Sequence, residues 1–163
     1  MTNRRYLLGC TVICCILFLS SGALAQTLQI INADGHATSV TRAQIANLPH
    51  VTVDTRDHDK AAQFEGVALA PLLATAGIQL GDALRGPRMS EVLLVEAADG
   101  YKVVFALAEV DPAFATREII LAYKRDGKPM DAREGPFRIV APGDKRPARW
   151  IRQVTTLKIV TPK

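Results

Sequence analysis

A short C-terminal segment concentrates cationic residues that could bind an anion. Between Arg138 and Arg152 there is one acid, Asp144, and there are five cations: Arg138, Lys145, Arg146, Arg149 and Arg152. Guanidinium groups make planar, bidentate contacts with phosphate or carboxylate. Gly and Pro residues fix the backbone path, and amides near Gly143 could complete an anion-binding nest. The alternative is a solvated surface that Trp150 anchors in the core.

A second polar cluster, at residues 54–59, has the sequence Asp-Thr-Arg-Asp-His-Asp. Three carboxylates and an imidazole are donors that divalent cations accept. The spacing does not match a calcium-binding loop, however, and no glycine stands where such a loop turns. We therefore expect a solvated acidic loop whose charges pair with Arg56 and Lys60, and we assign no metal site.

The N-terminal segment, residues 1–25, has the three parts of a secretory signal peptide. Arginines stand at positions 4 and 5, an almost wholly apolar run covers positions 6–19, and Ala23-Leu24-Ala25 is a small-x-small cleavage site. The run is shorter than the roughly 20 residues that a spanning helix needs, which disfavours an uncleaved anchor. We expect cleavage before Gln26, a periplasmic or secreted product, and no stable membrane insertion afterwards.

All three cysteines, Cys10, Cys14 and Cys15, lie in this predicted leader. Cys10 ends a sequence like a lipid-attachment box, but the box precedes the apolar run instead of following it, which disfavours a lipoprotein. The expected mature chain, residues 26–163, offers no thiolate for a disulfide, a metal or nucleophilic catalysis. Its formal net charge falls from +4 to +2 without the two leader arginines. That balance does not suggest nucleic acid or a membrane surface as a partner.

This mature chain has a length that suits one domain with a real core. Tight turns recur at short intervals, which predicts an α+β, mostly β fold with a few short helices. A doubly wound parallel sheet is disfavoured because no long helices join the strands. Strands are expected over 28–31, 37–40, 51–55, 91–98, 101–107, 119–123, 137–140 and 154–160. Hairpin turns are expected at Asp34-Gly35, Asp99-Gly100 and Asp126-Gly127.

Local signals between these strands predict two short helices and a polar loop. Thr41 and Gln44 form a capping box at the start of the first helix. The second helix follows residue 67, and Gly77 is its natural C-terminal cap. Residues 56–63 are expected to form a polar loop. Tyr101, which opens a strand, is expected to pack across the sheet rather than to line a pocket.

The order of several short motifs resembles the oxidoreductase molybdopterin-binding domain of sulfite oxidase and its bacterial periplasmic relatives. The motifs that carry this resemblance are Phe64-Glu65-Gly66-Val67-Ala68-Leu69 with Leu72-Leu73 and Ala76-Gly77, Ala98-Asp99-Gly100-Tyr101, Asp126-Gly127-Lys128-Pro129-Met130, Gly135-Pro136-x-Arg138-x-Val140-x-Pro142-Gly143, and Arg149-Trp150-Ile151-Arg152. Each is weak alone, but their order and spacing are specific together. The resemblance implies a sulfite oxidase-type molybdopterin-binding fold with a mixed sheet over residues 26–163.

The resemblance also identifies a departure from the family pattern. In catalytic members a cysteine thiolate binds molybdenum from the strand and loop before the G-V-x-L segment. The matching region here, Val51 to Asp57, has no cysteine, and Asp54 or Thr55 could offer only oxygen. Cations that contact the cofactor's phosphate and pterin fall, by motif, on Arg138, Arg149 and Arg152. The family's histidine and asparagine contacts find no match.

These residues fit a domain that has kept a basic surface but lost its cofactor better than they fit a complete cofactor pocket. We expect an exported, non-catalytic domain without catalytic residues or a bound cofactor, which binds an anionic small molecule or a periplasmic protein partner. The first alternative is a periplasmic molybdenum-cofactor oxidoreductase that binds molybdopterin and holds the metal through a non-cysteine ligand. The second is an interaction domain whose arginines make only surface ion pairs.

Overall fold

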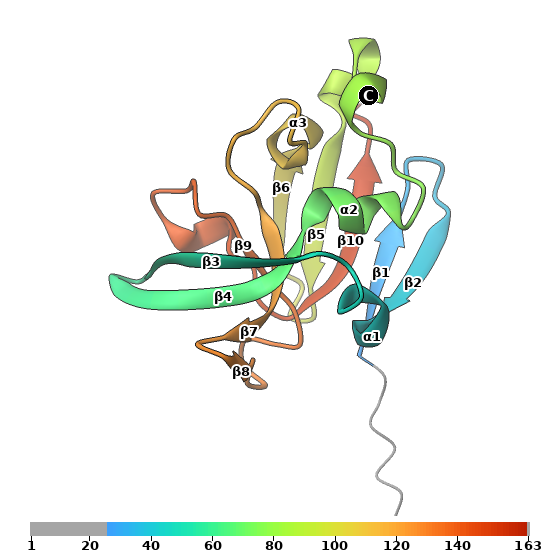
Figure 1. Cartoon of the computed structure of the whole chain (residues 1–163). Coiled ribbons are helices and arrows are strands. Elements are labelled where there is room, and N and C mark those ends of the chain that lie inside the picture. Colours follow the sequence, from blue (N-terminus) through green and yellow to red (C-terminus); the bar gives the residue numbers. More distant parts are fainter. Residues whose placement is uncertain (1–25, 163) are drawn as a thin grey trace, which may run out of the picture.

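Two five-stranded sheets form the body of the domain (Figure 1). The computed structural model describes residues 26–162, so the leader predicted for residues 1–25 lies outside the described residues. Within the described part of the chain, no helix is both long enough and apolar enough to cross a bilayer. The α+β, mostly β prediction is confirmed.

The first sheet is mixed and has the strand order β2-β1-β10-β5-β6. Its strands are β1 (Thr27–Ile31), β2 (Ala37–Thr41), β5 (Val92–Ala97), β6 (Lys102–Ala106) and β10 (Val154–Val160). The first and last strands of the domain, β1 and β10, run parallel, whereas the other pairs are antiparallel. The first sheet thus joins the first and last strands of the described residues.

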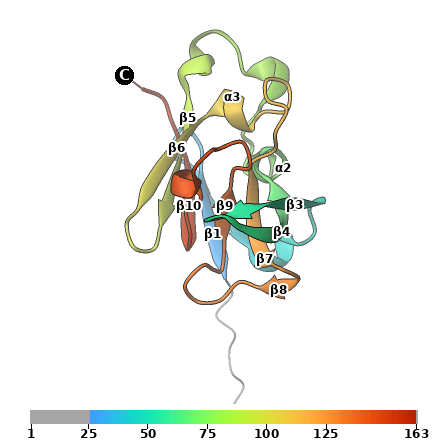
Figure 2. The same ribbon diagram turned by 90° about the vertical axis from the view of Figure 1, so that its left-hand side faces the viewer.

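The second sheet is antiparallel and has the order β3-β4-β7-β8, with β9 also paired to β7. Its strands are β3 (His50–Asp57), β4 (Lys60–Ala68), β7 (Ile120–Arg125), β8 (Lys128–Pro129) and β9 (Arg138–Val140). The β3–β4 hairpin projects from the body, to the side in Figure 1 and towards the viewer in Figure 2. Its outer strand, β3, is an edge strand.

Short helices connect the strands. They are α1 (Arg42–Ile45), α2 (Leu69–Ala74), α3 (Leu107–Val110) and the 3-10 turns η1 (Gly81–Ala83), η2 (Gly86–Ser90) and η3 (Pro147–Arg149). The capping box of α1 is confirmed: the Gln44 amide donates to the Thr41 hydroxyl at 3.3 Å, and the Thr41 amide donates to the Gln44 side chain at 2.8 Å. Gly77, at φ +74°, follows the end of α2.

Side chains from both sheets form one continuous core. Phe64 of β4 and Phe105 of β6 are fully buried. Trp150 is buried as well, packs edge-on against Phe64, and donates its indole N–H to the carbonyl oxygen of Ala141 at 2.9 Å. The expected Trp150 anchor is therefore present, and it fixes the segment that carries the predicted arginines.

Gly66 lies where β4 and β7 approach each other most tightly. A Cβ atom at this position would stand 2.2 Å from the carbonyl oxygen of Leu121, so no side chain fits there. The register between the two strands also shifts between Glu65 and Gly66. The glycine of the G-V-x-L motif is thus required by strand packing.

The polar loop expected over residues 56–63 is wrong, because this segment is a hairpin. β3 continues to Asp57, His58 and Asp59 make the turn, and β4 begins at Lys60. Both turn residues have positive φ, 49° and 67°, which is the geometry of a two-residue primed turn. Glycine usually occupies such a turn, so the sequence lacked the usual signal.

Candidate anion-binding site

A buried ion pair links the tip of the hairpin to the C-terminal segment. The Arg138 guanidinium donates to the Asp57 carboxylate through Nη1 at 2.9 Å and Nη2 at 3.2 Å. Only 3% of the Arg138 side chain and 5% of Asp57 are exposed. The solvated acidic loop expected at residues 54–59 is therefore wrong at Asp57, which pairs with Arg138 rather than with Arg56 or Lys60.

Two further residues complete this pair as a charge-balanced cluster. Arg125 donates through Nη1 to Asp57 at 3.1 Å and to Glu134 at 2.9 Å, and Glu134 also accepts from Arg138 at 3.1 Å. The guanidinium of Arg138 lies 5.2 Å from the ring centroid of Phe64, a cation–π distance. Arg125 and Arg138 are thereby neutralised by the two carboxylates, and we call the four residues the ionic cluster.

The ionic cluster keeps Asp57 ionised. Burial on its own raises the pKa of a carboxyl group. The hydrogen bond and the charge of Arg138 act in the opposite direction, with help from His58 and Arg125, and the pKa of Asp57 falls below its ordinary value. One nitrogen, Nε of Arg138, is buried and has no hydrogen-bond partner within residues 26–162.

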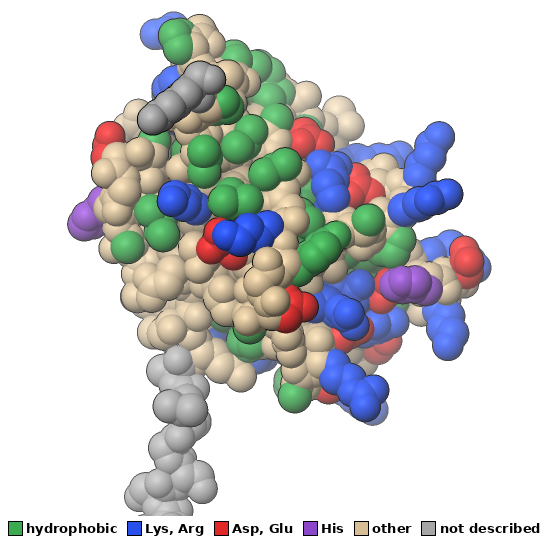
Figure 3. All heavy atoms as spheres, turned by 180° about the vertical axis from the view of Figure 1, so that it is seen from behind, with side chains coloured by type: hydrophobic (Ala, Val, Ile, Leu, Met, Phe, Trp, Pro, Cys, Tyr) green, Lys and Arg blue, Asp and Glu red, His purple; other side chains and the backbone are tan. Residues whose placement is uncertain are grey.

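A cavity of about 620 Å³ opens beside the ionic cluster, and we call it the basic pocket. It is lined by Asp57, His58, Lys60, Asp99, Tyr101, Arg125, Arg133, Glu134, Arg138, Pro147, Ala148, Trp150, Ile151, Arg152 and Gln153. The side chains of Lys60, Arg133 and Arg152 are exposed and make no ion pair with any described residue. Lys and Arg side chains gather on the flank of the molecule seen at the right in Figure 3.

Tyr101 also faces the basic pocket, and its expected packing across the sheet is wrong. It is 52% exposed, and its hydroxyl donates to the carbonyl oxygen of Ala148 at 3.1 Å. The residue directly precedes β6, and its carbonyl oxygen accepts the backbone amide of Ala97, the last residue of β5, at 3.0 Å. Its ring is free to form part of the pocket wall.

The three predicted arginines do not converge on one site. Arg138 and Arg152 both line the basic pocket. Arg149 lies elsewhere, because it donates to Asp144 at 2.6 Å and to Glu109 at 3.1 Å while its guanidinium stacks 4.5 Å from the Phe105 ring centroid. The bond to Asp144, with Glu109, outweighs the effect of burial and raises the pKa of Arg149.

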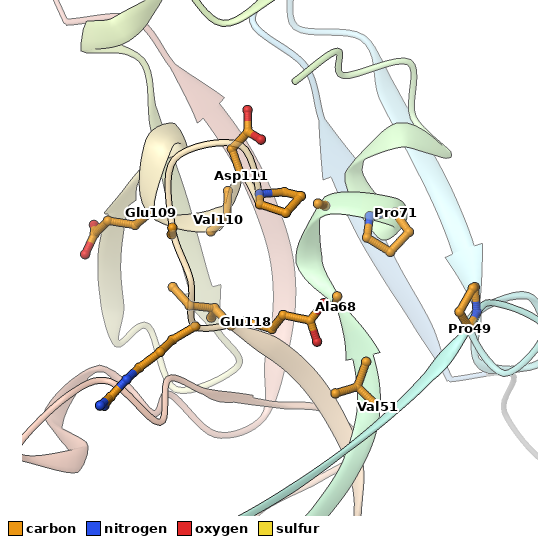
Figure 4. Close-up of a pocket in the computed structure, with 13 residues that line it drawn as sticks. Pro49, Val51, Ala68, Pro71, Glu109, Val110, Asp111 and Glu118 are labelled. Atoms are coloured by element: carbon orange, nitrogen blue, oxygen red, sulfur yellow. The ribbon is translucent and has the colours of Figure 1, made fainter. Parts of the chain in front are cut away.

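A second hollow follows β3 on the side away from β4, and we call it the acidic cleft. It consists of three adjoining cavities of about 130, 210 and 830 Å³ that share Ala115 and Arg117. Among the described residues, its cationic lining residues are Arg117 and Arg149. Its carboxylates are Asp54, Glu109, Asp111, Glu118 and Asp144. Figure 4 shows its apolar end, where Val51, Ala68, Pro71 and Val110 meet.

Comparison with known proteins assigns the fold to a family. Residues 47–162 match the family model described as the oxidoreductase molybdopterin binding domain. The chain belongs to this family. As a molybdopterin-binding domain of the sulfite oxidase type, it confirms the fold that the motifs implied. None of the curated proteins compared matches the chain.

Among solved structures, this molybdopterin-binding domain is similar to the sulfane dehydrogenase SoxCD from Paracoccus pantotrophus. The two share 19% sequence identity at a TM-score of 0.64, and the match covers 83% of this chain but 38% of the SoxCD chain. At this identity the likeness concerns the fold alone. The chain therefore spans well under half of the length of that neighbour.

Sequence reasoning missed Asp57, Lys60 and Arg133 as lining residues of the basic pocket. One signal could have found Asp57, since the alternation of half-buried Val51, Val53 and Thr55 continues to it and places it on the inner face of β3. Lys60 and Arg133 carry no such signal. They reach the pocket only because the hairpin folds back beside the segment after β8.

Proposed function

We propose that this domain is an exported, non-catalytic member of its family that binds an anionic small molecule in the basic pocket. The observation that carries the proposal is a group of three exposed cations around one cavity, Lys60, Arg133 and Arg152, which make no ion pair within residues 26–162. Phosphate and carboxylate groups are the anions that such side chains bind.

The charges of the pocket support this reading. Five cations and three carboxylates line it. The ionic cluster cancels two charges of each sign, which leaves Lys60, Arg133 and Arg152 opposed by Asp99 alone. A concave site with one prevailing sign of charge concentrates ligands of the opposite sign. Its volume of about 620 Å³ also lies within the range of small-molecule sites, roughly 300–1,000 Å³.

The non-catalytic part of the proposal follows from the donors on β3. The region that corresponds to the metal-binding cysteine, Val51 to Asp57, offers oxygen but no sulfur, and residues 26–163 contain no cysteine. Val51 to Thr55 line the acidic cleft, whose carboxylates outnumber its arginines five to two. A dithiolene and a phosphate are both anionic, so these residues do not fit a molybdenum cofactor.

A molybdenum-dependent oxidoreductase is the second candidate, and family membership favours it. The two candidates predict different metal contents for protein purified from a host that makes the cofactor and exports the chain. We expect no stoichiometric molybdenum by elemental analysis and no pterin absorbance. One molybdenum atom per chain, together with turnover of sulfite, would contradict the non-catalytic proposal.

Anion binding is tested by thermal unfolding in inorganic phosphate and pyrophosphate, since a ligand that binds only the native state raises the melting temperature. We expect a concentration-dependent rise that an Arg152→Ala, Arg133→Ala double variant loses. Arg85→Ala is the matched control, because Arg85 is an exposed arginine without an ion pair to the described residues and lies outside the pocket. An equal rise in all three proteins would show a nonspecific salt effect.

Export is the remaining part of the proposal. The secreted product should begin at Gln26. Intact mass measurement of protein released from the periplasm tests this start. A mass that includes residues 1–25 would contradict cleavage.

A further inference from the structure

The outer edge of β3 is unpaired. β3 is the first strand of its sheet and pairs only with β4. Apart from this pairing with β4, no backbone hydrogen bond joins the eight residues of β3 to the rest of residues 26–162. An exposed strand edge presents a row of N–H and C=O groups that can pair with another extended chain.

The hairpin geometry identifies which groups face outwards. Residues that flank a two-residue turn, here Asp57 and Lys60, form a hydrogen-bonded pair, and bonded and non-bonded pairs then alternate along the strands. Non-bonded positions on β3 therefore fall on His50, Thr52, Asp54 and Arg56. Their backbone N–H and C=O groups point away from β4.

The acidic cleft runs along this same edge. Five consecutive residues, Val51 to Thr55, line its largest cavity, of about 830 Å³. Side chains alternate between the faces of a strand, so an unbroken run of lining residues means that the cavity follows the strand edge itself. The opposite wall is the loop from Pro112 to Glu118, together with Pro142. The groove therefore has room beside the unpaired backbone.

An apolar socket ends the groove near the start of β3. Pro49, Val51, Ala68, Pro71 and Val110 line it, and Glu118 reaches towards Ala68 at its rim (Figure 4). A peptide that pairs with an edge strand presents alternate side chains to one face, and a pocket on that face selects an apolar one. The socket is placed to give this selection.

The net charge of the acidic cleft indicates which sign of charge a partner segment should carry. Arg149 is held by Asp144 and Glu109, which removes these three residues from the balance. Asp54, Asp111 and Glu118 remain, opposed by Arg117, which donates only to the carbonyl oxygen of Pro142 among the described residues. Asp111 accepts two backbone amides but no cation. The groove is therefore net negative.

We propose that the edge of β3 binds an extended, basic segment of a partner protein by strand addition, with an apolar side chain of that segment in the socket. The backbone edge supplies the pairing, the socket supplies register, and the carboxylates supply charge selection. The proposal uses none of the cations of the basic pocket, so it stands or fails independently of anion binding.

A second copy of this chain is a less suitable occupant. Edge-to-edge pairing of two β3 strands would bring Asp54 of each copy beside the acidic cleft of the other. Like charges in close contact oppose association. Self-pairing is therefore the competing outcome that the experiment must detect.

The first experiment uses the exported protein and a blocked hexapeptide of alternating lysine and valine. Fluorescence anisotropy should show saturable binding that weakens as salt is added. The same peptide with glutamate in place of lysine should not bind. Amide shifts in a ¹⁵N spectrum should be largest for Thr52, Asp54 and Arg56. Equal binding of both peptides, or shifts confined to other residues, would overturn the proposal.

The second experiment removes single pairing groups. Thr52→Pro deletes one outward N–H, a change that an edge strand tolerates; Thr52→Ala keeps the N–H and is the control. We expect Thr52→Pro to bind the lysine peptide about fivefold more weakly, the effect of one net hydrogen bond, and Thr52→Ala to bind normally. A peptide N-methylated at alternate residues makes the same test on the unmodified protein, where folding is not in question.

Sedimentation velocity distinguishes a partner protein from a second copy of this chain as the occupant of the β3 edge. If the edge serves a partner protein, the unmodified chain stays monomeric over the concentrations of the binding assay. A dimer that Thr52→Pro dissociates would assign the edge to a second copy and overturn the proposal. Unchanged affinity for the N-methylated peptide would overturn it as well.

Discussion

The basic pocket and the acidic cleft are both lined by β3, but the charges left without a partner are positive in the pocket and negative in the cleft. Asp57 enters the basic pocket, whereas Val51 to Thr55 line the acidic cleft. In the basic pocket the buried charges are compensated by the ionic cluster, and the exposed cations are left over. In the acidic cleft the arginine Arg149 is compensated, and carboxylates are left over. The charges that lack a partner, rather than the number of charged residues, determine what each region attracts.

The three predicted arginines illustrate the same difference. Arg138 is buried and neutralised, Arg149 is half-buried and neutralised, and Arg152 is exposed without an ion-pair partner among residues 26–162. The sequence motif treats them alike. Of the three, Arg152 alone has no ion pair within residues 26–162, whereas the ion pairs of the other two hold neighbouring segments together.

The largest expected effect comes from breaking the ionic cluster. Asp57→Ala removes the bidentate acceptor of the buried Arg138 and leaves Glu134 as the one carboxylate of the cluster to balance both Arg125 and Arg138, which should lower the free energy of unfolding by about 3 kcal/mol. Urea denaturation followed by far-UV circular dichroism measures this change. The control is Asp54→Ala on the same strand, where the carboxylate is exposed and the loss should stay below about 0.5 kcal/mol. Equal losses would mean that the two regions do not differ in charge burial.

The pH dependence of stability sharpens the same contrast. The pKa of Asp57 is lowered in the folded state, so its ionisation stabilises the fold above the pKa of an unfolded aspartate, about 4, and this contribution is lost as the pH falls further. The difference in stability between the unmodified protein and Asp57→Asn should therefore be constant near neutral pH and shrink in acid. A difference that grew as the pH fell into the acid range would contradict the assignment.

Variants of Arg149 and Arg152 should have different effects, one on the free energy of unfolding and the other on phosphate binding. Arg149→Ala breaks two ion pairs at a partly exposed site and should cost about 1 kcal/mol of unfolding free energy, with little change in phosphate affinity. Arg152→Ala should leave stability unchanged and weaken phosphate binding. Chemical denaturation and phosphate titration of both variants measure the two effects. The reverse pattern would place the anion site at Arg149.

The smallest effect is expected at the rim of the acidic cleft. Glu118→Gln removes an exposed carboxylate without an ion pair among the residues described, so its unfolding free energy should change by less than about 0.5 kcal/mol. Its affinity for the lysine-valine peptide should fall, and the salt dependence of binding should become shallower. Anisotropy titrations at two salt concentrations measure this. An unchanged salt dependence would remove Glu118 from charge selection.

Local signals predicted much of the fold. The strand expected over residues 154–160 is β10, which occupies those residues, and the capping box of α1 has both predicted hydrogen bonds. Alternation, turn residues and caps act over a few residues, and a sequence displays them directly. The motifs also indicated the family, because their order and spacing are specific together although each motif alone is ambiguous.

The site was less predictable because its contacts are long-range. Asp57 and Arg138 are 81 positions apart, and no local sign in the sequence identifies them as partners. A run of charged residues ordinarily indicates a solvated loop, which is why the prediction for residues 56–63 is wrong. The pairing of Arg149 with Glu109 crosses 40 positions for the same reason. Charge type can be read from a sequence, but charge compensation depends on the tertiary fold.

The tight contact at Gly66 links the interior of the second sheet to the walls of the basic pocket. β4 lies between β3 and β7, and β7 in turn carries Arg125 and pairs with the strand that bears Arg138. A methyl group at position 66 would wedge β7 outwards and draw both arginines away from the acid on β3. The absence of a side chain at Gly66 thus helps to align Arg125 and Arg138 in the basic pocket, although Gly66 does not line it.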